Sequence, residues 1–81
     1  MSSLLKRSFS LAGHRTSVAL EAEFWAALAA IAAARGQSLS ALVAATDQER
    51  EAGHPLASAL RVMALRHAPR ARENVVSAAG G

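Results

Sequence analysis

The fold is decided by residues 15–25, which read RTSVALEAEFW. In residues 15–20, apolar or β-branched side chains alternate with polar or small ones. Side chains two apart on a strand lie on the same face, so this alternation predicts a short strand with one apolar face. Thr16, Val18 and Leu20 make up that face, and the polar face is free to meet solvent or a ligand.

A helix follows this strand with no room for a turn. Leu20 and Trp25 are spaced for a hydrophobic staple across a helix start at Glu21. Strong helix formers continue to Arg35, and Gly36 stands where a left-handed residue usually ends a helix. The apolar stripe of this helix contains Phe24, Trp25, Leu28 and Ile31.

Two further helices are predicted. Ser38 is the expected N-cap of the first, with Ser40 as the alternative, and Pro55 suits the first turn of the second. Pro69 is expected to end that last helix, and residues 69–81 are interpreted as a disordered tail. The expected buried faces consist of Leu39, Leu42, Val43 and Thr46, then of Leu56, Ala59, Leu60 and Met63, widened by Val62 and Leu65.

Residues 1–14 admit two interpretations. Phe9 and Leu11 alternate with Ser8 and Ser10, which favours an extra strand that runs from Lys6. The other interpretation is a flexible basic arm. No other segment has a strand pattern as clear as residues 15–20, and a lone strand leaves backbone hydrogen-bonding groups unpaired. We therefore expect that strand to pair with the same strand of a second copy.

Composition also favours a second copy. The chain has 81 residues, enough for one small domain, and 21 of its apolar residues are alanines. Alanine contributes little apolar area, so the large side chains of one copy are few, and a core shared in an oligomer is expected.

Charge is unevenly distributed along the chain. The net charge is +3, made of +3 in residues 1–20, −3 in residues 21–51 and +3 in residues 52–81. This asymmetry favours a polyanionic partner, with nucleic acid preferred over a membrane because no basic amphipathic helix accompanies it. The absence of cysteine, of a signal peptide and of a membrane span predicts a cytoplasmic protein.

The order of a strand, a helix ending in glycine, a tight turn with a capping serine and a second helix resembles the ribbon-helix-helix superfamily, which contains the Arc and methionine repressors. More closely, the chain resembles a bacterial branch of small ribbon-helix-helix proteins of largely unassigned role. The resemblance covers residues 4–67. It is carried by KRS at 6–8, GHRTSV at 13–18, LE at 20–21, EFW at 23–25 and RGQSL at 35–39.

This resemblance implies a mostly α-helical protein with one short strand per protomer. Two copies would form an intertwined homodimer with a two-stranded antiparallel ribbon, and each would add a third, C-terminal helix. The implied domain spans residues 15–68. The implied dimer core contains Val18, Leu20, Phe24, Trp25, Leu28, Ile31, Leu39, Leu42 and Val43.

In the family the ribbon enters the major groove of DNA, where outward-facing strand residues contact base edges. The matching residues here are Arg15, Ser17 and Ala19. Ala19 offers no hydrogen bond, so only Arg15 and Ser17 of this strand can hydrogen-bond base edges. The expected phosphate contacts are Ser38, Leu39 and Ser40 at a helix start, with Lys6 and Arg7.

We therefore expect a sequence-specific transcriptional regulator, a repressor, whose partners are double-stranded DNA and a second copy of itself. Further assembly of dimers on DNA is left open. The histidines (His14, His54 and His67) lie on three different predicted elements, and we expect no metal site, cofactor or catalytic residue. The alternatives are an antitoxin with a toxin partner, and a dimerisation or adaptor module that does not bind DNA.

Overall fold

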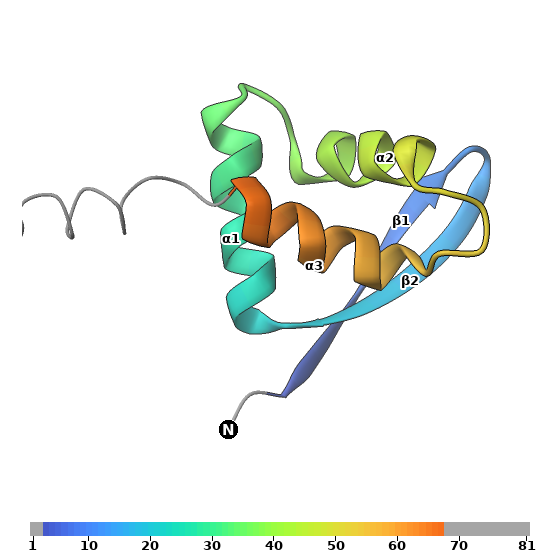
Figure 1. The fold of residues 1–81 in the computed structure, drawn as a ribbon, viewed down its shortest axis with the longest axis horizontal. Coiled ribbons are helices and arrows are strands. Elements are labelled where there is room, and N and C mark those ends of the chain that lie inside the picture. Colours follow the sequence, from blue (N-terminus) through green and yellow to red (C-terminus); the bar gives the residue numbers. More distant parts are fainter. Residues whose placement is uncertain (1–2, 68–81) are drawn as a thin grey trace, which may run out of the picture.

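The polypeptide forms a β-hairpin followed by three helices, which lie together against one side of the hairpin (Figure 1). The computed structural model describes residues 3–67, and the predicted tail at residues 69–81 lies outside this range. The elements are β1 (Leu4–Leu11), β2 (His14–Glu21), α1 (Ala22–Ala34), α2 (Leu39–Glu49) and α3 (Leu56–His67). This order is that of a ribbon-helix-helix fold with an added helix, as the sequence predicted.

The two strands pair antiparallel along their whole length, from Leu4 opposite Glu21 to Leu11 opposite His14. The loop between them is the dipeptide formed by Ala12 and Gly13, whose φ angles are 51° and 83°. Positive φ at both central residues is the geometry of a type I′ turn, whose twist matches that of the flanking strands. The hairpin is therefore closed by the tightest common connection.

This hairpin differs from the expectation of one strand per chain. The partner of β2 is β1 of the same chain. β1 lies in residues 1–14, for which the sequence left both an extra strand and a flexible arm as interpretations. The physical reason is that β1 has its own apolar face. Phe9 and Leu11 are 6% and 5% exposed, and burying them helps to stabilise the strand.

The corner between α1 and α2 is formed by local capping. Gly36 has a φ of 69°, and the Gln37 N–H donates to the Ala32 carbonyl at 2.9 Å, as in a Schellman motif. Ser38 Oγ then accepts from the Ala41 N–H at 3.0 Å and caps α2. The chain bends by 98° between the axes of α1 and α2.

Within residues 3–67 no single helix is long and apolar enough to cross a membrane. The bent pair of α1 and α2 would pass the same test by length and composition alone.

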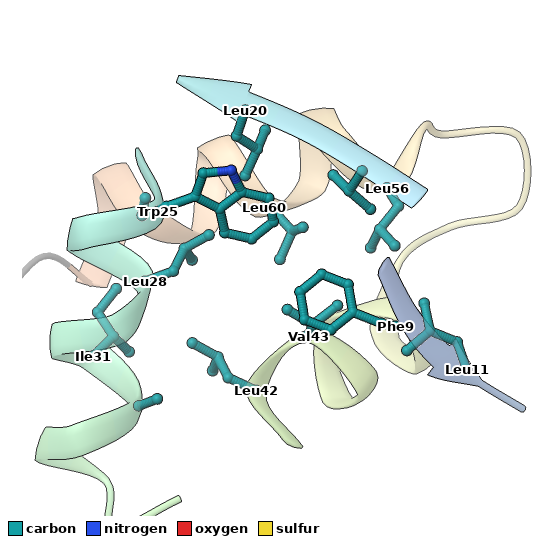
Figure 2. Close-up of a cluster of buried hydrophobic side chains, with 13 residues drawn as sticks. Phe9, Leu11, Leu20, Trp25, Leu28, Ile31, Leu42, Val43, Leu56 and Leu60 are labelled. Carbon is teal, nitrogen blue, oxygen red and sulfur yellow. The ribbon is translucent and has the colours of Figure 1, made fainter. Parts of the chain in front are cut away.

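The hydrophobic core draws on every element (Figure 2). On α3 the buried residues are Leu56, Leu60 and Ala64, spaced four apart. Val62 and Leu65, which were predicted to widen this stripe, are 45% and 75% exposed. Successive residues of a helix are rotated by ~100°, so Val62 and Leu65, two and five residues after Leu60, point away from the buried stripe. The prediction that they widen it was wrong. The buried apolar residues are Phe9, Leu11, Val18, Leu20, Trp25, Leu28, Ile31, Ala32, Leu42, Val43, Leu56, Leu60 and Ala64.

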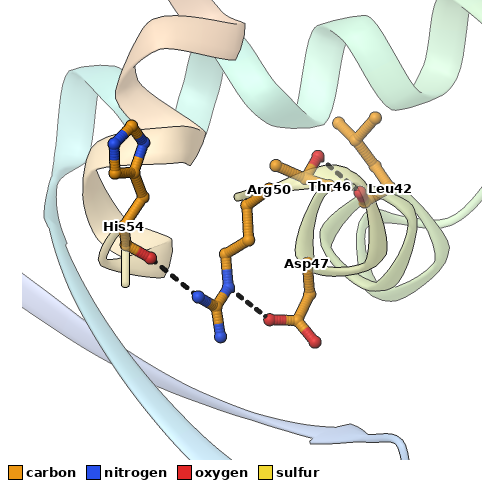
Figure 3. A network of polar contacts seen from close by, with 5 residues as sticks. All are labelled: Leu42, Thr46, Asp47, Arg50 and His54. Atoms are coloured by element: carbon orange, nitrogen blue, oxygen red, sulfur yellow. Dashed lines mark hydrogen bonds and ion pairs between the residues drawn. The ribbon is translucent and has the colours of Figure 1, made fainter. Parts of the chain in front are cut away.

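Polar contacts hold the connection between α2 and α3 (Figure 3). Arg50 donates from Nε to Asp47 Oδ1 at 2.8 Å and from Nη1 to the His54 carbonyl at 2.7 Å. The buried Thr46 hydroxyl donates to the Leu42 carbonyl at 2.9 Å, so its hydrogen bond stays within α2. One guanidinium thus ties the end of α2 to the loop that returns the chain into α3.

The hairpin turn offers a test of this fold. Ala12 is the one non-glycine residue with positive φ among those described, and an L-residue there costs roughly 1–2 kcal/mol. Asn tolerates this conformation and Asn-Gly is favoured in type I′ turns, so Ala12→Asn should stabilise the protein by about 1 kcal/mol in urea unfolding. Ala52→Asn, in an exposed turn without positive φ, is the matched control. An unchanged or lower stability for Ala12→Asn would contradict the turn geometry.

Candidate nucleic-acid interface

The two faces of the hairpin differ sharply in chemistry. One face is apolar and packs on the helices through residues such as Val18 and Leu20. Because side chains alternate along each strand, the remaining positions of both strands share the opposite face, which we call the outer face. At its centre three pairs of residues lie directly opposite one another. These residues are Lys6, Ser8 and Ser10 on β1, opposite Ala19, Ser17 and Arg15 on β2.

Hydrogen bonds cross the outer face from strand to strand. Ser8 Oγ and Ser17 Oγ are 3.2 Å apart. Arg15 donates from Nη1 to Ser10 Oγ at 3.3 Å, so its guanidinium lies over the ribbon. Hydroxyls and a guanidinium are the groups that hydrogen-bond base edges, and the outer face presents them in two adjacent rows.

The predicted base-contacting residues lie together on this face. Arg15 and Ser17 are exposed and Ala19 is half-buried. The sequence reasoning assigned no role to Ser8 and Ser10, which lie directly opposite Ser17 and Arg15. Their alternation with apolar neighbours on β1 was the signal that could have placed them here.

The predicted phosphate contacts are divided among separate places. Lys6 lies on the outer face, whereas Arg7 is on the inner face, with its guanidinium carbon 5.2 Å from the centre of the Trp25 ring. At the start of α2, Ser38 caps the helix, and Leu39 is half-buried against the core. Ser40 is exposed beside them.

The residues predicted as a dimer core form a core within one chain. Seven of the nine are buried, and Phe24 and Leu39 are partly buried against them. Residues of β1 and α3 complete this core and add the large apolar side chains that the predicted set lacked. Phe9, Leu11, Leu56 and Leu60 belong to it.

An ion pair marks the end of the ribbon at which α1 begins. Arg61 of α3 donates from Nε and Nη2 to Glu21 Oε1 at 3.2 and 3.1 Å, and its guanidinium carbon lies 5.7 Å from the centre of the Phe24 ring. The pKa of Glu21 is lowered by a hydrogen bond from its own backbone and by Arg61. The pair joins the last residue of β2 to α3.

The histidines lie on different elements. His14 begins β2, His54 is in the loop before α3, and His67 ends α3. Within residues 3–67 no group of three His, Cys, Asp or Glu side chains could hold a metal ion.

A cleft of about 460 Å³ lies between α2 and α3, lined by Thr46, Glu49, Arg50, Glu51, His54, Ala59, Val62, Met63, Arg66 and His67.

Comparison with known proteins gives one family match. A family model described as a ribbon-helix-helix domain matches residues 4–68, which include both strands and all three helices. Comparisons with curated proteins and with solved structures gave no match.

The pKa of Glu21, lowered first by its own backbone hydrogen bond and then by Arg61, predicts a dependence of stability on pH. The pKa of Glu21 is lowered from 4.5 in the folded protein, so its ionised form stabilises the fold above that value. This contribution should be lost as the pH falls through the lowered pKa. In denaturant unfolding, the stability difference between wild type and Glu21→Gln should therefore shrink below pH 4.5.

The exposed Glu49→Gln on α2 is the matched control. A stability difference between wild type and Glu21→Gln that stays constant with pH would contradict the role of the carboxylate.

Proposed function

Because the chain belongs to the ribbon-helix-helix family, whose members generally bind DNA as transcription regulators, we propose that it is a sequence-specific DNA-binding repressor. It acts by occupying an operator. The observation that carries this proposal is the outer face of the hairpin, where Arg15 and Ser17 are exposed on the strand whose other face is buried. Ribbon-helix-helix domains are typically non-enzymatic, which agrees with a role in binding.

The shape of the ribbon fits the major groove, which is ~12 Å wide and admits a two-stranded β-ribbon. Arg15 is suited to donate two hydrogen bonds to a guanine, and Ser17 can bond more than one base. The methyl group of Ala19 can contact a thymine methyl. These three residues discriminate base pairs in the proposed complex.

Phosphate contacts position the ribbon in this proposal. Lys6 adds positive charge beside the base-reading residues. Residues 38–40 form the start of α2, where backbone N–H groups without a partner inside the helix and the positive end of the helix dipole favour a phosphate. Such contacts release counterions, so log affinity should fall with log salt by about 0.9 per phosphate neutralised.

The acting unit in our proposal is a homodimer. Members of the family typically dimerise. In the single chain several large apolar side chains remain exposed, and such side chains favour association with another surface. They are Leu4, Leu5, Val62 and Leu65. A symmetric dimer predicts an operator that is an inverted repeat.

The antitoxin alternative receives less support from the fold. An antitoxin needs a segment that folds on its toxin, and residues 54–81 are the candidate that the sequence offers; of these, the structure describes residues 54–67, which include α3. Leu56, Leu60 and Ala64 of this helix are already buried in the chain's own core. Binding a toxin through that face of α3 would require the core to open.

Selection from a random duplex DNA library tests the function. We expect purified protein to enrich an inverted repeat, with retention that falls as salt rises. Retention without enrichment would indicate a non-specific basic binder. No retention at low or near-physiological salt would contradict the proposal and support the adaptor alternative.

Arg15 provides a test at the level of one residue. Arg15→Ala should weaken binding to the selected operator by ~1–3 kcal/mol and relax the preference at one base pair of each half-site. Arg66→Ala, which removes an exposed arginine from α3, is the matched control. Equal losses on every DNA sequence would make Arg15 a phosphate contact instead.

A further inference from the structure

The edge of β2 away from β1 is open in the single chain. The strand order of the sheet is β1-β2, so β2 has a strand beside it on one side only. The backbone of β1 is already bound by α1, because the Trp25 indole N–H donates to the Leu5 carbonyl at 2.8 Å. The open edge of β2 is therefore the place where another strand can be added to this sheet.

The symmetry of the proposed homodimer indicates which strand is added. In a closed dimer both copies use the same surface, so β2 of one copy pairs with β2 of the other. Pairing of β2 with β1 of another copy would leave an unpaired edge at each end and would continue into an open chain of molecules. The closed arrangement agrees with the shared ribbon that the family resemblance implies. It gives a four-stranded sheet in which the two β2 strands are central and each β1 strand lies outside them.

The major groove is too narrow for all four strands of this sheet. Neighbouring strands lie ~4.8 Å apart, so the two outer β1 strands would be about 14 Å from each other. The groove is ~12 Å wide and admits a two-stranded ribbon. The two β2 strands therefore fit inside the groove, and each β1 strand lies over one of the two phosphate backbones that border it.

The outer face of β1 has the chemistry of a phosphate contact. The three helices lie on the other side of the hairpin (Figure 1), and the outer-face residues of β1 are Lys6, Ser8 and Ser10. All three are exposed. Lysine and serine side chains are common donors to the phosphate oxygens of DNA.

We propose that β1 is a phosphate-binding strand, whose Lys6, Ser8 and Ser10 hold the DNA backbone on each side of a base-reading ribbon made of two β2 strands. This inference rests on the proposed DNA-binding function and its homodimer. It gives the two strands of the hairpin different roles. Arg15 and Ser17 of β2 contact bases, and β1 positions them in the groove.

Hydrogen bonds across the hairpin connect these two roles. Ser10 Oγ accepts from Arg15 Nη1 at 3.3 Å, so the Ser10 O–H can donate to a phosphate oxygen. Ser8 Oγ and Ser17 Oγ are 3.2 Å apart, and Ser8 can likewise accept from Ser17 and donate to a phosphate. A phosphate held by β1 thus orients the side chains of β2 that meet the bases.

Cysteine cross-linking tests the strand order without DNA. Directly opposite residues of an antiparallel pair point to the same face. In the two registers that overlap two β2 strands most fully, Ser17 is therefore opposite either Ser17 or Ala19 of the second copy. The Ser17→Cys/Ala19→Cys variant brings two cysteines to bridging distance in both registers. The matched control is Lys6→Cys/Ser8→Cys, at the β1 positions directly opposite them in the hairpin.

The chain has no cysteine of its own, so the cross-link has no background. After mild oxidation of the full chain, we expect a covalent dimer from Ser17→Cys/Ala19→Cys on a non-reducing denaturing gel. The β1 control should remain monomeric, because its cysteines are about 14 Å from those of the other copy and a disulfide needs Cα atoms within ~7 Å. A covalent dimer from the control, or none from either variant, would overturn the proposed strand order.

DNA binding tests the role of β1. Lys6→Ala should reduce the slope of log affinity against log salt by about 0.9 for each copy in the dimer. Ser8→Ala and Ser10→Ala should each weaken binding roughly tenfold, because a dimer loses two hydrogen bonds. These losses should be equal on the selected operator and on a scrambled duplex, since phosphate contacts carry no sequence information. Ser58→Ala and Arg66→Ala, which change exposed residues of α3, are the matched controls.

The outcomes separate this inference from the function on which it rests. If wild-type protein binds its operator and the β1 variants match the controls, or relax the preference at a base pair, the phosphate-binding role of β1 is wrong and the function stands. If wild-type protein enriches no DNA, both fail. The cross-linking result decides the strand order in either case.

Discussion

The position of the hairpin depends on Trp25. This side chain is 2% exposed, donates to the Leu5 carbonyl and packs against Phe9, so α1 fixes the strand that is farther from it in sequence. An indole N–H buried without a partner would be costly, so the bond to β1 also removes a penalty. With β1 fixed, the pairing of the two strands fixes β2, and the orientation of the outer face follows.

Much of this architecture could be predicted because its causes are local. The alternation in residues 15–20 predicted which side chains of β2 face the core, and Gly36 and Ser38 predicted the corner between α1 and α2. The pairing of β1 with β2 was left open, because the alternation in β1 had to be weighed against a flexible arm. The ion pair between Glu21 and Arg61 joins residues 40 apart in sequence, and no short-range pattern encodes such a contact.

The candidate site shows the same division. The outward positions of β2 followed from a period of two, whereas those of β1 depended on whether that segment was a strand at all. Lys6 and Arg7 illustrate the consequence, because adjacent basic residues look equivalent in a sequence but point to opposite faces of a strand. Lys6 lies on the outer face, and Arg7 lies over the Trp25 ring on the inner face.

A core closed within one chain changes what association with a second copy has to supply. The expectation of a shared core came from the many alanines, but β1 and α3 contribute enough large side chains to cover α1 and α2. If the chain dimerises as proposed, folding and dimerisation would be separable steps, because these core residues are already buried in the single chain. In the proposed homodimer, a second copy would cover the apolar side chains of β1 and α3 that the single chain leaves exposed. Two copies related by symmetry would also present two copies of the outer face.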